Sequence, residues 1–81
     1  MHVSLEAALA SPESLLEAEA SEILKSSPYR ELRDVSCLAH GQGVILAGRV
    51  SSFYYKQLAQ SLLKARLSTG VRLDNRLEVD H

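Results

Sequence analysis

Apolar residues recur along this 81-residue chain with two different spacings, and each spacing predicts a kind of element. Over residues 13–26 they return every three or four positions, which is typical of an amphipathic helix. Ser11 and Pro12 favour a helix start there, because serine caps free amides and proline suits the first turn. The helix is expected to end before Pro28, since a residue preceding proline avoids helical backbone angles. A connector of about one helical turn should follow.

The spacing then changes to a period of two, which predicts strands over residues 35–40 and 44–50. The short glycine-containing link 41–43 between them predicts an antiparallel hairpin and a turn, not a phosphate-binding loop. A second helix is predicted from Ser51 or Ser52, one of which should cap it, to about Ser68. A last strand is predicted over residues 71–79.

The resulting order, α-β-β-α-β, predicts an α+β fold. We expect a two-layer sandwich in which two helices cover one face of a three-stranded mixed sheet. A right-handed crossover through the second helix would make the last strand parallel to the second strand. The other face of the sheet should be open or in contact with a partner. Residues 1–12 are expected to be weakly ordered, and residues 13–81 to form the domain.

The composition is that of a small globular domain, with 46% hydrophobic and 23% charged residues. The net charge of −1 conceals an uneven distribution. Residues 1–27 carry five acidic residues and one basic residue, whereas residues 49–73 carry five basic residues and no acidic one. This asymmetry suggests an anionic partner for the second part of the chain, although solvated helix surfaces also carry charge.

The residue types that carry chemistry are sparse. A single cysteine excludes an internal disulfide framework, and the three histidines show no metal-ligand or catalytic spacing. Cys37 alternates with apolar neighbours and is expected in the core, whereas His40, beside the turn, should face solvent. We therefore expect no catalytic residue, metal, cofactor or small-molecule substrate. The chain shows no signal peptide or membrane-spanning segment, and its location is not assigned.

Phe53 interrupts the polar side of the second helix. It is expected either to pack against the connector around Pro28 and Tyr29 or against the end of the hairpin, or to be exposed and enter a membrane interface or a partner's pocket. Tyr54 and Tyr55 fall on the apolar side and are expected at the core or its margin. The candidate binding residues are Arg49, Phe53, Lys56, Gln60 and Lys64.

The segment 43–52, with sequence GVILAGRVSS, resembles the core motif of BON domains (bacterial osmotically-inducible and nodulation proteins). Further matches lie in the second helix and in the C-terminal part of the family's motif. The resemblance covers residues 14–79. These further matching positions are Lys56, Ala59, Gly70, Val71, Asn75, Leu77 and Val79. The chain has one residue fewer than the usual pattern between Gly70 and Asn75, which predicts a tighter turn there.

The resemblance implies the same α-β-β-α-β fold, no catalytic residues, and binding to phospholipid membranes or hydrophobic protein partners. Such domains are often found in envelope proteins. The positions expected to be structural are Gly43, Gly48, Gly70 and Asn75. Gly48, inside a strand, is expected to let a helix approach the sheet closely.

Two other functions remain open from the residues alone. The domain would oligomerise through the open sheet face if Leu38, Ile45 and Ala47 form an apolar strip there. A nucleic-acid-binding module is disfavoured, because the chain lacks the G-x-x-G loop of KH domains and its isoelectric point is near 6.3.

Overall fold

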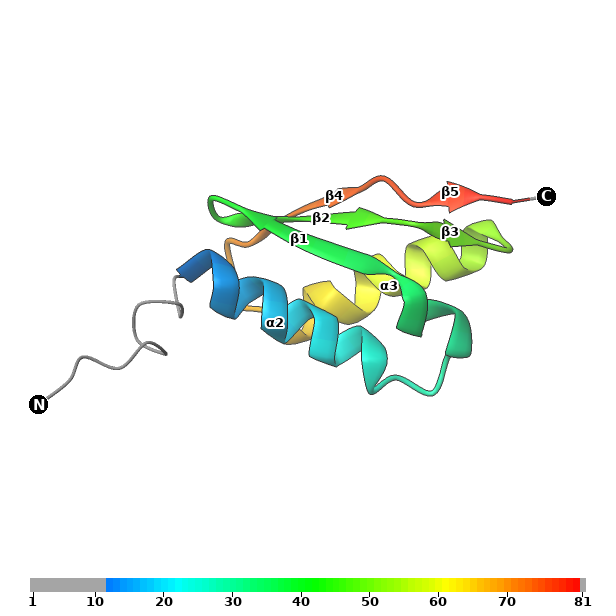
Figure 1. Cartoon of the computed structure of the whole chain (residues 1–81), viewed down its shortest axis with the longest axis horizontal. Coiled ribbons are helices and arrows are strands. Elements are labelled where there is room, and N and C mark those ends of the chain that lie inside the picture. Colours follow the sequence, from blue (N-terminus) through cyan, green and yellow to red (C-terminus); the bar gives the residue numbers. More distant parts are fainter. Residues whose placement is uncertain (1–11, 81) are drawn as a thin grey trace, which may run out of the picture.

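The structure, a computed structural model of the chain, describes residues 12–80 (Figure 1). In chain order the elements are α2 (Pro12–Lys25), the 3-10 helix η1 (Arg30–Asp34), β1 (Ser36–His40), β2 (Gly43–Ala47), β3 (Arg49–Val50), α3 (Phe53–Arg66), β4 (Arg72–Asn75) and β5 (Glu78–Val79). The predicted order is confirmed, with η1 as the expected helical turn. The last two predicted strands are each divided in two. The predicted cap Ser11 and the N-terminal segment before α2 lie outside the described residues.

Helices α2 and α3 lie on one face of the sheet β1-β2-β4, and no described element covers the other face (Figure 1). β1 pairs with β2 in antiparallel orientation, and β2 pairs with β4 in parallel orientation. The parallel pairing follows from the crossover through α3, which returns the chain to the end of the sheet where β2 began. The predicted α+β sandwich with a mixed sheet is therefore confirmed.

β3 and β5 form a second, two-stranded parallel sheet, which continues the register of β2 and β4 beyond a break. Gly43 lies opposite Arg72 and Arg49 lies opposite Glu78, so both ladders share the same sequence separation. Between them, the Arg76 amide donates to the Leu46 oxygen and the Glu78 amide donates to the Gly48 oxygen, each at 2.9 Å. The side-chain alternation predicted for both strands thus continues through the interruption.

Gly48 causes the interruption in the second strand. Its φ is +132°, in the left-handed range that favours glycine. The three atoms nearest to a Cβ added there would be Leu77 Cδ2, Asp34 O and Val35 Cα. All three would lie at ordinary contact distances of 3.7–3.8 Å. Gly48 was predicted to let a helix approach the sheet closely, and this prediction is wrong. The backbone conformation at this position requires glycine, not the closeness of a helix.

The core lies between the inner face of the sheet and the two helices. Its largest fully buried side chains are Leu24, Leu32, Leu46, Leu63, Leu77, Val44 and Val50. Cys37 is buried and His40 is exposed, as predicted. The turn before β4 contains Gly70 at φ +96°, and Val71 and Leu73 after it both pack against the core. Val71 and Leu73 thus lie on the same, inner face of the sheet although the chain has one residue fewer between Gly70 and Asn75.

The β1 edge of the sheet is covered by side chains from α2. Glu17 Oε1 accepts a hydrogen bond from the Ala39 amide at 3.0 Å, and Glu13 Oε2 accepts one from the Gly41 amide at 2.6 Å. Carboxylates on backbone amides make strong, charge-assisted hydrogen bonds. These carboxylates accept hydrogen bonds from amides that would otherwise be free to pair with another strand at this edge.

Candidate binding surface

The start of α3 is fixed by a contact between segments that are distant in the sequence. The Glu31 carboxylate in η1 accepts hydrogen bonds from both the amide and the hydroxyl of Ser51. Ser52 occupies the N-cap position with extended backbone angles, but its side chain makes no capping hydrogen bond. A serine side chain was expected to cap this helix, yet the Ser51 hydroxyl is directed to Glu31. The anchored Ser51 determines where the first turn of α3 lies.

Two aromatic side chains protrude from that first turn. Phe53 and Tyr54 are each 61% exposed. Of the two alternatives for Phe53, the structure bears out exposure, whereas Tyr54, expected at the core or its margin, is not buried. Tyr54 lies at one margin of a broad apolar arc, and α3 buries the opposite part of that arc, around Ala59 and Leu63. The result is an adjacent pair of large, exposed aromatic rings.

The exposed pair is connected to the core by ring contacts. Tyr54 and Tyr55 lie 5.4 Å apart between ring centroids, with an interplanar angle of 69°. Tyr55 in turn lies 6.5 Å from Tyr29, again edge to face at 67°. Both of these inner rings pack against the core. Edge-to-face contacts of this kind stabilise by about 0.5–1.5 kcal/mol, so they hold Tyr54 in a defined position.

Two of the candidate residues lie on the side of α3 that faces β4. Asn75 Nδ2 donates to the Lys56 main-chain oxygen at 2.8 Å and to Gln60 Oε1 at 3.2 Å. Lys56 and Gln60 are both half-buried. Gln60 therefore has a structural partner within the domain, and Asn75 holds the sheet against the helix, as its expected structural role requires.

The remaining candidates lie apart from one another. Lys64 is exposed on α3, near the helical position of Phe53, since eleven residues make about three turns. Arg49 lies in β3, in the sheet layer, where it pairs in register with Glu78. It lines a shallow depression together with Glu78, Val79 and Asp80. The structure thus brings Phe53 and Lys64 to one face and places Arg49 on another, beside acidic residues.

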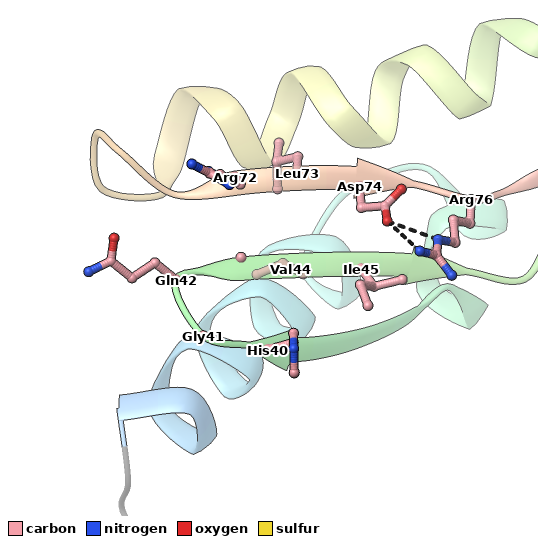
Figure 2. A pocket seen from close by; sticks show the side chains of 10 residues that line it. His40, Gly41, Gln42, Val44, Ile45, Arg72, Leu73, Asp74 and Arg76 are labelled. Carbon is pink, nitrogen blue, oxygen red and sulfur yellow. Dashed lines mark hydrogen bonds and ion pairs between the residues drawn. The ribbon is translucent and has the colours of Figure 1, made fainter.

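The uncovered sheet face, expected to be open or to contact a partner, carries a depression that was not predicted. The depression is lined by residues of the hairpin and of β4, including His40, Ile45 and Arg72 (Figure 2). Beside it, the Arg76 guanidinium makes an ion pair with Asp74 at 2.9 Å. The alternation of charged residues after Arg72 is visible in the sequence. Only the sheet register brings these residues beside the hairpin.

The described residues hold little reactive chemistry. Burial raises the pKa of the Cys37 thiol above its ordinary value, and a side-chain hydrogen bond with Ser21 opposes this change. The thiol is therefore a protonated core group at neutral pH. Residues 12–80 contain no group of three or more histidine, cysteine or acidic side chains placed to hold a metal ion. None of the helices among them has the length and apolar character needed to cross a membrane.

No family model, curated protein or solved structure matches this chain. The resemblance to BON domains consequently stays a prediction that rests on the residues quoted above.

Proposed function

We propose that this domain is a non-catalytic binding module of the BON type that attaches to anionic phospholipid surfaces through the exposed side of α3. The observation that carries the proposal is the adjacent pair Phe53 and Tyr54, each 61% exposed. Large exposed aromatic side chains on one helical turn are unusual on a surface that contacts only water. Aromatic rings are favoured at the boundary between lipid headgroups and acyl chains.

The shape of α3 suits contact with a flat surface. With about 100° between successive residues, Phe53, Gln57 and Lys64 fall on one side of the helix, and Tyr54 and Ser61 lie beside them. All five are exposed. An aromatic end and a polar, basic remainder would let the first turn enter the interface while Lys64 stays among the headgroups.

The charge around α3 adds electrostatic attraction. Residues 49–73 contain no acidic residue, and Lys56 and Lys64 lie on α3 itself. Each basic side chain near an anionic membrane contributes about 1 kcal/mol, and this contribution falls within a Debye length. One exposed lysine on this face, Lys64, and two aromatic rings would give weak, reversible attachment that high salt disrupts.

Vesicle co-sedimentation tests the proposal. The protein is expected to sediment with phosphatidylglycerol-containing vesicles more than with pure phosphatidylcholine vesicles, and Phe53→Glu should abolish the difference. Leu15→Glu is the matched control, because Leu15 is a similarly exposed apolar side chain (59%) on α2. If both vesicle types sediment equal amounts, and Phe53→Glu has no effect, lipid binding is wrong. The exposed pair would then be assigned to a protein partner.

A second candidate function, oligomerisation through the uncovered sheet face, is favoured by Leu38. This side chain is 56% exposed on β1 and lies opposite Ile45 of β2 in the register. Sedimentation velocity at high protein concentration tests it, with Leu38→Lys as the disrupting variant. A species that sediments as a monomer throughout would exclude this function.

A further inference from the structure

β4 and β5 form an open edge of the sheet, and no described element lies beyond them (Figure 1). The amides of Arg72, Arg76 and Glu78 donate inward, to oxygens of Gln42, Leu46 and Gly48. Because successive residues of a strand direct their N–H and C=O groups to opposite sides, the residues between them direct these groups to the open edge. These outward residues are Leu73, Asn75, Leu77 and Val79. Unpaired edge groups of this kind are a template for pairing with another strand.

The sequence of this edge is complementary to itself in the antiparallel direction. Residues 71–79 read VRLDNRLEV. With a twofold axis at Asn75, Arg72 lies opposite Glu78 and Asp74 lies opposite Arg76. Leu73 likewise lies opposite Leu77. Opposite charges that face each other across two strands are stabilising.

Neighbouring registers lack this complementarity. An axis at Asp74 places Arg72 against Arg76, and an axis at Arg76 places Asp74 against Glu78. Like charges directly opposite one another are destabilising. All of these charged side chains are exposed, so the charges select one register without help from the core.

We infer that two copies of this chain pair through the β4–β5 edge, antiparallel about a twofold axis at Asn75. The sheets of the two copies would then form one continuous sheet, with α2 and α3 of both copies on the same face. The ion pair between Asp74 and Arg76, whose side chains are 51% and 67% exposed, becomes a cluster of four charges around the axis. Each complementary pair occurs twice, as in any isologous interface.

One amide at this edge has a partner within the chain. Asn75 Oδ1 accepts a hydrogen bond from the Leu77 amide at 3.2 Å. Pairing in this register replaces that long hydrogen bond by one to the Leu73 oxygen of the second copy. The inference is independent of the lipid-binding proposal, because it uses the sheet edge and not the exposed side of α3.

Charge reversal tests the pairing. Sedimentation equilibrium at low salt should show a dimer of the wild-type chain. Arg72→Glu and Glu78→Arg should each raise the dissociation constant of this dimer by about tenfold or more, because each change places like charges opposite one another twice. The double variant Arg72→Glu/Glu78→Arg restores opposite charges and should restore the dimer. Arg30→Glu, the same charge change at an exposed position of η1, should leave it unaffected.

Amide hydrogen exchange locates the interface. Exchange at Leu73 and Val79 should slow as protein concentration rises, whereas exchange at Ala39, on the edge covered by α2, should not change. A chain that is monomeric at every concentration overturns the inference, as does a double variant that fails to rescue. A dimer that Leu38→Lys abolishes, and that both single charge reversals leave intact, assigns the interface to the uncovered sheet face instead.

Discussion

The Asn75 side-chain nitrogen lies 2.8 Å from the Lys56 main-chain oxygen, to which it donates a hydrogen bond. The oxygen of the same side chain accepts a hydrogen bond from the Leu77 amide. A single amide group therefore joins the outer strand of the sheet to α3 and also defines the bend between β4 and β5. The asparagine amide carries its donor and its acceptor on separate atoms, so one side chain makes both contacts.

Asn75→Ala should lower the free energy of unfolding by about 1–3 kcal/mol, because it leaves the Leu77 amide without its partner and removes the link to α3. Urea denaturation at low protein concentration measures the change. Asp74→Ala is the control: its exposed ion pair with Arg76 should contribute at most about 1 kcal/mol. Equal effects of the two substitutions would contradict the role assigned to Asn75.

Gly48→Ala should destabilise the domain by about 1–3 kcal/mol, because alanine disfavours a φ of +132°. Gly43→Ala provides the comparison, since no positive φ is found at Gly43 and an added Cβ would lie 3.3 Å from the Arg72 oxygen. Thermal denaturation of both variants should show the larger loss for Gly48→Ala. The reverse order would mean that close approach, and not backbone conformation, is the stronger requirement.

The domain should lose stability at alkaline pH through Cys37. Burial raises the pKa of this thiol above the ordinary value of 9.0 that it has in the unfolded chain. As pH rises past that value the unfolded state loses the proton first, so the free energy of unfolding falls until the folded thiol also titrates. The measurement is the difference in the free energy of unfolding between wild type and Cys37→Ala, followed from about pH 7 to about pH 10, the range in which thiols ionise. A difference that does not vary with pH would contradict the assignment.

Glu17→Ala should speed hydrogen exchange at the Ala39 amide, because it removes the carboxylate that accepts the hydrogen bond from this amide. Glu17→Gln retains an acceptor oxygen and should preserve most of the protection. Exchange followed by NMR compares the two variants with the wild type. Unchanged exchange in Glu17→Ala would show that α2 does not protect this edge.

Much of the fold followed from the sequence because burial has a simple period. Alternation over Val44 and Leu46, and over Leu73 and Leu77, predicted which side chains lie on the inner face, and the structure confirms it. The preference for right-handed crossovers then predicted that the last strand runs parallel to the second strand. The break at Gly48 did not follow, because a positive φ leaves no trace in the hydrophobic pattern.

The binding surface was predicted less completely. A helical wheel gives the width of an apolar arc but not which part of it meets the core, so the large exposure of Tyr54, at the margin of that arc, was not predicted. Arg49 was grouped with the residues of α3 because it is near them in the sequence. It belongs to a strand, and the register with Glu78 that separates it from them depends on pairing between distant segments.

The two edges of this sheet differ, and the difference limits how far an assembly can extend. Glu17 occupies the Ala39 amide of β1 and Glu13 the Gly41 amide of the turn that follows, whereas no described strand pairs with the outer edge of β4 and β5. A sheet with two available edges can add copies without end and form fibres. A sheet with one available edge pairs that edge when the dimer forms. No free edge is then left, so assembly stops at two copies. Under the inferred pairing, the acidic residues of α2 therefore limit the assembly to two copies.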